Sequence, residues 1–190
     1  MIRWLKARTR YIRSKQKVSH LSGLVFPALD IGCGAYPFWD ADFAADVEFT
    51  IFDLPEMQKK LAGKFVRCDI HYLPFASSSF AFVHSSNVLE HTEDPQKAFA
   101  ELKRVGRHGF AETPSAFFEK VINHSPRHRW IICWENERLV AENVRGLFDK
   151  NVYLFSPLTW WIRNHLPLLW KAIMVILDIG LNLAYNKYRW

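Results

Sequence analysis

The stretch LDIGCGAYPF, residues 29–38, decides the fold of this chain. An apolar run ends in the acid Asp30, and Gly32 and Gly34 follow one residue apart. Glycine lets a backbone turn sharply and approach a ligand, because a Cβ there would collide or force unfavourable dihedral angles. Three interpretations fit such a loop: a nicotinamide-type dinucleotide site, a site for a mononucleotide with a sulfonium tail, or a tight turn without a ligand.

The segments around this loop alternate between short apolar runs and one clear helix. Strands are expected at residues 26–31, 48–53, 64–69, 79–86 and 109–114, and the helix at 94–105. Asp94 can cap that helix, Pro95 suits its first position, and Gly106 ends it. Residues 129–134 and a return strand from 138 predict a hairpin. The pattern therefore predicts an α/β/α sandwich with a mostly parallel sheet and a C-terminal antiparallel hairpin.

Acidic residues recur at the carboxyl ends of the expected strands, where ligands bind in such sheets. Asp53 follows Gly34 by 19 residues, the distance at which an acid binds both hydroxyls of a ribose. Asp30 would repel a pyrophosphate but attract the ammonium group of an amino acid. Pro37 replaces the third glycine of the dinucleotide fingerprint. The loop therefore favours a ligand with a ribose and an amino-acid end.

Three stretches together resemble a known family. They are LDIGCG, the pair Phe52 and Asp53, and CDIHYLPFASSSFAFVHSSNVLEHTEDPQKAFAELKRV, within residues 24–114. The chain is similar to the class I S-adenosylmethionine-dependent methyltransferases, and within them to the type 11 group. The resemblance implies a Rossmann-like fold, S-adenosyl-L-methionine as cofactor, and a methyl-transfer activity.

The resemblance also implies which residues hold the cofactor. The methionine part is expected at the first loop, the ribose at Asp53 with Leu54 beside the adenine, and the adenine amino group at Asp69 with Ile70 on the ring. Ser86, after the fourth strand, is expected to contact the cofactor through its backbone. The loop residues implied are Asp30, Gly32, Cys33 and Gly34.

The methyl acceptor is less constrained, because the cofactor supplies the reactive carbon and the protein mainly aligns donor and acceptor. A hydroxyl acceptor would benefit from a base. His91, near the expected methyl position, and Glu112, at the end of the fifth strand, are the favoured candidates. The others are His84, His124 and His128. His84 lies within a strand and fits a hydrogen-bonded core histidine better. Residues 123–130 are dense in His and Arg but lack a carboxylate or cysteine at ligand spacing, so no metal is expected.

Charge divides the chain into three parts. Residues 1–20 hold seven Lys and Arg and no acid, whereas the whole chain carries +6, so the remainder is close to neutral. We expect a basic N-terminal arm at 1–20, the methyltransferase domain at 21–150, and an apolar helical extension at 151–190. The arm suits an anionic membrane surface or a nucleic-acid backbone, and nucleic acid is the less expected partner. A solvated tail or a helix packed on the domain is the alternative.

Residues 166–185 form a long apolar stretch with a narrow polar stripe of Lys171, Asp178 and Asn182. Burying the Lys and the Asp in a bilayer would cost about 3 kcal/mol each, so a helix lying flat at the membrane interface fits better than a spanning one. Packing on the domain core or in a homodimer is the alternative. The three cysteines form no CxxC pair, which fits reduced thiols in the cytoplasm, with peripheral binding at the inner face of the membrane.

The favoured function is methyl transfer to a small-molecule or lipid-linked acceptor. Two rivals stay open. One is a non-catalytic nucleotide-binding module that acts through its basic arm on RNA or a membrane surface. The other is an NAD-dependent oxidoreductase, against which Asp30 and Pro37 argue.

Overall fold

The computed structural model describes residues 27–48, 55–119, 127–136, 138–144, 156–176 and 185–190. The chain forms two compact units. The first comprises Met1–Ser86, Lys97–Ala111 and Arg189–Trp190, and the second comprises Asn87–Gln96 and Glu112–Tyr188. The predicted basic arm lies outside the described residues.

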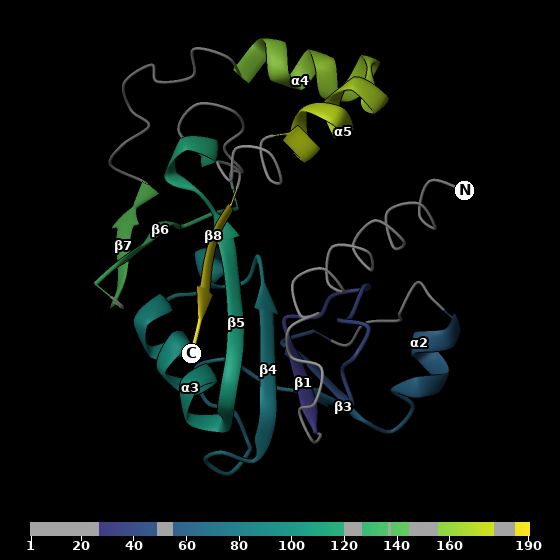
Figure 1. Ribbon diagram of the computed structural model, residues 1–190, viewed down its shortest axis with the longest axis vertical. Helices are drawn as coiled ribbons and strands as arrows, with labels where there is room; N and C mark the ends of the chain where they lie inside the picture. The colour runs from purple at the N-terminus through teal and green to yellow at the C-terminus, as the bar shows by residue number, and fades with distance from the viewer. Residues whose placement is uncertain (1–26, 49–54, 120–126, 137, 145–155, 177–184) are drawn as a thin grey trace. The chain divides into compact units, whose positions relative to one another are not determined.

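A six-stranded sheet has the order β3-β2-β1-β4-β5-β8 (Figure 1). Its strands are β1 (Ala28–Ile31), β2 (Phe43–Asp46), β3 (Phe65–Arg67), β4 (Phe80–Ser86), β5 (Gly106–Pro114) and β8 (Tyr185–Arg189). The pairs β1–β2, β1–β4 and β2–β3 are parallel. The predicted α/β fold with a mostly parallel sheet is confirmed.

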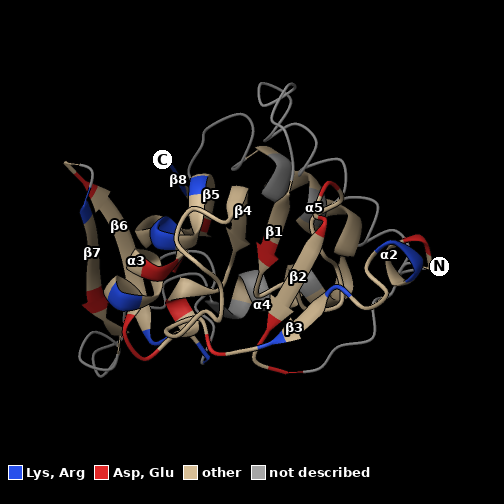
Figure 2. Ribbon diagram, turned by 90° about the horizontal axis from the view of Figure 1, so that it is seen from below, with Lys and Arg blue, Asp and Glu red and all other residues tan. Residues whose placement is uncertain are grey.

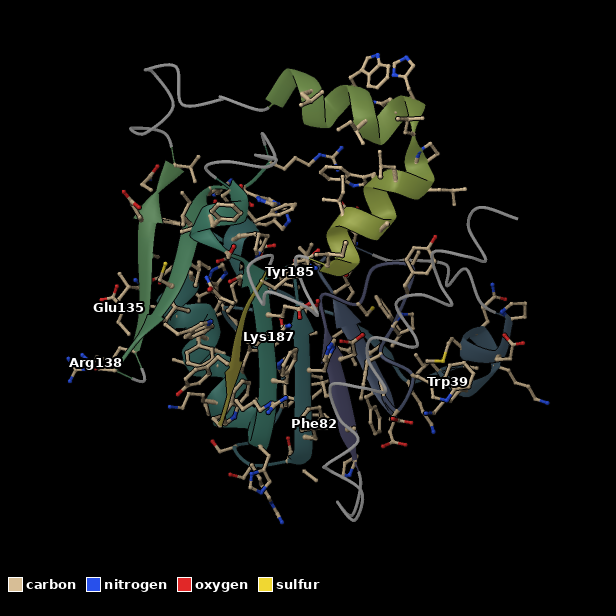
Figure 3. The ribbon with its side chains drawn as sticks, turned by 45° about the horizontal axis from the view of Figure 1, so that its top comes forward. Trp39, Phe82, Glu135, Arg138, Tyr185 and Lys187 are labelled. Carbon is tan, nitrogen blue, oxygen red and sulfur yellow. The ribbon has the colours of Figure 1, made fainter. Side chains whose placement is uncertain are left out.

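The apolar side chains of the first unit pack on this sheet. Leu29 and Val83 are fully buried, and Phe38, Phe82 and Phe110 belong to one core cluster. Phe82 is labelled on β4 in Figure 3. The predicted helix is α3 (Pro95–Val105), whose apolar face is buried. That face consists of Ala98, Leu102 and Val105.

The second strand lies earlier than predicted. The sequence favours residues 48–53, whereas β2 spans Phe43–Asp46, Glu48 is exposed, and residues 49–54 lie outside the described residues. The segment FAAD is rich in alanine, which favours helices, and was therefore not expected to be a strand. Ala44 and Ala45 are fully buried between neighbouring elements, so tertiary packing overrides this local preference.

The C-terminal segment closes one edge of the large sheet. The backbones of Gly109 and Trp190 exchange hydrogen bonds in both directions, at 3.0 and 3.3 Å, which is the pattern of an antiparallel pair. A Cβ on Gly109 would lie 2.1 Å from the Trp190 indole, so this contact requires glycine. The expectation of a wholly helical extension over 151–190 is therefore wrong at its end, where aromatic residues favour a strand.

The second unit contains the predicted hairpin, β6 (Trp130–Glu135) and β7 (Arg138–Asn143). Its pairing runs from Trp130 opposite Asn143 to Glu135 opposite Arg138, the pair labelled at the hairpin tip in Figure 3. The hairpin forms a separate two-stranded sheet rather than the edge of the large one. The edge of the large sheet next to β5 is formed by β8.

Three further helical segments belong to the second unit. They are the 3-10 helix η2 (Leu89–His91), α4 (Ser156–His165) and α5 (Pro167–Val175). A long helix was predicted over 166–185, and α5 covers its first part as far as Val175. Residues 177–184, with Asp178 and Asn182, lie outside the described residues. Within the part of the chain that the structure describes, every helix is too short or too polar to cross a membrane.

Candidate cofactor site

The direction in which the strands are added reverses between β1 and β4. From β1 the chain builds β2 and β3 on one side and then returns to place β4 on the other. In parallel sheets ligands bind beside the carboxyl ends of the strands at such a reversal. Figure 2 shows acidic residues on β1 and β2 near this position. The loop after β1 and the ends of its neighbours are therefore the candidate site.

The loop after β1 has the backbone conformation that the glycines predict. Gly32 and Gly34 have φ angles of +69° and +49°, where a side chain is disfavoured. The Gly32 N–H donates to the Ala45 carbonyl at 2.8 Å, and the Gly34 N–H donates to Asp46 Oδ2 at 2.9 Å. The space next to Gly34 is open, since a Cβ there would meet no atom within 4 Å. The loop is thus tied to β2 and keeps an open side.

Asp30 is buried, with 3% of its surface exposed, and both of its oxygens are engaged inside the protein. Its Oδ2 accepts the Phe38 N–H at 2.6 Å, and its Oδ1 lies 2.7 Å from His84 Nδ1. The His84 ring also stacks on Phe38 with ring centroids 4.7 Å apart. Asp30 therefore fixes the path of the loop, and its direct contact with a cofactor stays a prediction. His84 is the hydrogen-bonded core histidine that its place in a strand favours.

Asp46 is the site candidate that the sequence interpretation missed. It ends β2, is half-buried, and accepts N–H groups from Gly34 at 2.9 Å and from Glu48 at 3.4 Å. A sequence signal for Asp46 was present: FAAD is a short apolar run that ends in an acid, and the strand ALDI likewise contains an acid near its end. The count of residues from the loop pointed instead to Asp53, which with Leu54 lies outside the described residues.

Asp69 follows β3 and is exposed over 54% of its side chain. Its Oδ1 accepts the backbone N–H of His71 at 2.9 Å and lies 2.6 Å from His71 Nδ1. The hydrogen bond from the His71 backbone is the main cause that lowers the pKa of Asp69 below its usual value. An exposed, ionised carboxylate beside the half-buried Ile70 is compatible with the predicted adenine contacts.

Two cysteines, Cys33 in the loop and Cys68 before Asp69, have thiol pKa values above the ordinary value. Burial, with Asp30 and then Asp46 nearby, raises the pKa of Cys33 far above its ordinary value. Burial also raises the pKa of Cys68 to about 11. Both thiols stay protonated at neutral pH, so neither acts as a nucleophile or a thiolate ligand. Cys33 is a buried part of the loop, and Ser86 is half-buried at the end of β4.

The predicted bases His91 and Glu112 belong to the second unit. Glu112 is buried, and its carbonyl accepts the Asn87 N–H at 2.8 Å. His91 Nδ1 lies 3.2 Å from the Arg127 carbonyl, and its ring meets the His128 ring edge-on with centroids 4.7 Å apart. Burial is the main cause that lowers the pKa of His91.

A second group of polar residues surrounds His91. Glu90 is buried with 1% exposure, and burial raises its pKa to about 8. His128 Nδ1 lies 2.5 Å from Oε1 of the buried Glu119. Sequence reasoning did not bring these residues together, because Glu90 and His91 are far from His128 along the chain and no spacing pattern links them.

One family model matches part of the chain. Residues 29–109 match the family model of a methyltransferase domain. No curated protein matches the sequence. The match covers β1, the loop after it, and the elements that follow as far as the start of β5.

Several solved structures are similar. A methyltransferase of Thermotoga maritima, described as a possible histamine N-methyltransferase, is 14% identical, with 64% of this chain and 59% of that chain covered and a TM-score of 0.45. A Pyrococcus horikoshii protein is 19% identical (57% and 55% covered, TM-score 0.46). A putative methyltransferase of Bacillus halodurans is 19% identical (53% and 51% covered, TM-score 0.39). The chain thus spans less than two thirds of the length of these proteins.

Proposed function

We infer that this chain, whose residues 29–109 match the family model of a methyltransferase domain, is a class I S-adenosylmethionine-dependent methyltransferase of the type 11 group that binds S-adenosyl-L-methionine and transfers its methyl group to an acceptor. The observation that carries the proposal is the loop after β1. Two glycines with positive φ stand where the strand order reverses, and an acid on the neighbouring strand holds the loop.

The residues present fit this cofactor. The open side of Gly34 lets the backbone come close to the methionine part, and Asp30 holds the loop from inside through Phe38. When bound, the cofactor supplies a methyl group on a positively charged sulfur, so the protein needs to orient the partners and exclude water rather than activate the donor. The loop therefore acts by positioning.

We assign the ribose to Asp46. It ends the strand adjacent to β1, and it is partly exposed. An ionised carboxylate has about four lone-pair sites, so the two N–H groups described for Asp46 leave capacity for hydroxyl donors. Because Gly34 and the ribose would share this carboxylate, ribose binding would also hold the loop. Asp69 with Ile70 is the proposed adenine contact, and Ser86 the proposed backbone contact.

The test compares two acids. Binding of S-adenosylhomocysteine to the purified chain is measured by titration calorimetry for Asp46→Asn and Asp53→Asn. We expect Asp46→Asn to weaken binding at least tenfold, which is about 1.4 kcal/mol, and Asp53→Asn to leave it near the wild-type value. The opposite ranking would return the ribose to Asp53. A chain that binds NAD but not S-adenosylhomocysteine would refute the proposed function, and binding without methyl transfer in any cell extract would favour the non-catalytic module.

The acceptor we propose is a small apolar or lipid-linked molecule at an anionic membrane surface. Large apolar side chains are exposed on and beside α4 and α5, with Leu168 at 79% exposure. Two forces bind proteins to anionic lipid: burial of apolar side chains and attraction of basic residues to the lipid charge. The exposed apolar helices would supply the first, and the seven basic residues of 1–20 the second. The exposed residues are Leu158, Trp161, Leu166, Leu168, Leu169 and Ile176.

Vesicle flotation tests this part separately. The double variant Leu168→Ser and Leu169→Ser should float less with vesicles containing phosphatidylserine than the wild type does. Tyr72→Ser, which removes an exposed apolar side chain outside these helices, is the matched control and should float normally. Equal flotation of all three proteins would leave a soluble small-molecule acceptor as the proposal.

A further inference from the structure

Three potential metal ligands converge in the second unit. One ligand atom each from Glu90, His91 and His128 lie within 4.8 Å of one another. Two hydrogen bonds hold the segments that carry them together. The Arg129 N–H donates to the Glu90 carbonyl at 2.8 Å, and Trp130 Nε1 donates to the Thr92 carbonyl at 2.9 Å. Hydrogen bonds to two backbone carbonyls therefore hold together the two segments that carry the cluster.

Glu90 gives an independent sign of a missing ligand. Its side chain is 1% exposed, and among the described residues neither of its carboxylate oxygens has a hydrogen-bond partner. A buried carboxylate is costly unless it is hydrogen-bonded, paired or bound to a metal. The backbone N–H of Glu90 favours the ionised form, whereas Glu119 and Glu112 add negative charge nearby and disfavour it. A divalent cation would offset most of this negative charge.

The two histidines are oriented as metal ligands are. A ligating histidine usually donates its second ring N–H to a carbonyl or a carboxylate, which fixes its tautomer. His91 Nδ1 lies 3.2 Å from the Arg127 carbonyl, and His128 Nδ1 lies 2.5 Å from Glu119 Oε1. In both rings this geometry assigns Nε2 to the metal. Glu119 would then be the carboxylate that orients His128.

We propose that Glu90, His91 and His128 bind a divalent transition-metal ion, with zinc as the best match, and that Glu119 positions His128. Two histidines and one carboxylate suit zinc and leave a fourth position for water or an oxygen-bearing ligand. Zinc bonds of about 2.0–2.1 Å set tetrahedral ligand atoms about 3.3 Å apart. His91 Nε2 and Glu90 Oε1 are 4.0 Å apart, so small side-chain rotations close the site. His91 is 40% exposed, which gives an ion access from solvent.

The experiment uses the full chain, stripped with a chelator and then titrated with zinc. We expect one equivalent to bind to the wild type, as measured by calorimetry and by metal content after dialysis. Glu90→Gln and His91→Ala should each weaken binding at least tenfold. Glu119→Gln should weaken it about 10- to 100-fold, as loss of a carboxylate behind a metal-bound histidine does. His108→Ala, which removes an exposed histidine of the first unit, should bind like the wild type.

Cobalt gives a second readout. Co²⁺ in a four-coordinate site absorbs visible light strongly, whereas a loosely held six-coordinate ion does so weakly. The strong band should appear in the wild type and be absent in His91→Ala, a change at a partly exposed side chain that should leave the fold intact. Wild-type zinc affinity in both Glu90→Gln and His91→Ala would overturn the proposal, as would an equal loss in His108→Ala. Cofactor binding is measured in parallel, so failure here is distinct from failure of the proposed function.

Discussion

Asp30 and Glu90 are two buried acids that lie near histidines, and the protein treats them in opposite ways. Asp30 receives an N–H from Phe38 at 2.6 Å and lies 2.7 Å from His84 Nδ1. Both oxygens of Glu90 lack a hydrogen-bond partner in the described part of the chain. A buried acid with its donors in place stabilises a loop, whereas one without them is poised for a proton or a cation. Burial alone therefore does not mark a functional carboxylate; the surrounding donors do.

The largest effect should come from removing the acid that has its partners. Asp30→Ala leaves the Phe38 N–H and the His84 ring without their acceptor, so we expect a loss of about 3 kcal/mol in the free energy of unfolding, measured in urea. Asp42→Ala is the matched control, because Asp42 accepts only one described hydrogen bond, from the Ala28 N–H. It should cost about 1 kcal/mol. Equal losses in the two variants would contradict the role given to Asp30.

Glu90→Gln should raise the free energy of unfolding of the metal-free protein, whereas Asp30→Ala lowers it. The pKa of Glu90 is raised from 4.5 to about 8, so between these values the unfolded chain has released a proton that the folded chain retains. Stability therefore falls as the pH rises through this window. Above about pH 8, Glu90→Gln should be more stable than the wild type by on the order of 2 kcal/mol.

Urea unfolding with chelator at about pH 4.5 and about pH 8 measures this difference. Saturating zinc should remove most of the wild-type loss, because the ion pairs with the carboxylate. If the two proteins lose stability in parallel across the window, the buried carboxylate has partners that our account lacks.

A change at Asp46, which holds the cofactor loop, should have an effect of intermediate size, on cofactor affinity. The tenfold loss expected for Asp46→Asn should be specific to binding, because asparagine can still accept the Gly34 N–H. Its free energy of unfolding should stay within about 1 kcal/mol of the wild type. A larger loss of stability would make Asp46 a second structural acid like Asp30.

The smallest expected effect comes from replacing single glycines, which separates the cost of a positive φ angle from the loss of a cofactor contact. Gly34 and Gly63 have φ angles of +49° and +70°, and a Cβ on either would meet no neighbouring atom. Replacing each with Ala should cost about 1 kcal/mol of stability, because both force a side chain into the left-handed region. Only Gly34→Ala should also weaken S-adenosylhomocysteine binding, as measured by calorimetry. Equal affinities of the two variants would remove the loop from the cofactor site.

Part of the fold could be predicted because its signals are local. The run before Gly32, the strand around Phe82 and the helix between Pro95 and Gly106 combine apolar spacing with glycine or proline at their ends. The alanine-rich β2 carried a weak local signal, and its strand conformation depends on burial beside β1. The C-terminal strand depends on a contact between Gly109 and Trp190, which no short-range pattern shows.

The same distinction applies to the sites. The glycines of the first loop were predicted and have the positive φ angles that glycine permits. Asp46 was missed because the count of residues assumed a later second strand. The cluster brings Glu90 and His91 next to the segment of Arg127 and His128; His91 and the Arg127 carbonyl that it contacts are 36 positions apart, so only the fold reveals the cluster.

A crystal structure with S-adenosylhomocysteine tests the central claim most directly. We predict that its amino-acid part lies along the loop of Gly32 and Gly34, with both ribose hydroxyls within hydrogen-bond distance of Asp46. A ribose held by Asp53 would correct the residue and keep the function. A cofactor bound away from this loop, or none bound at saturating concentration, would contradict the account.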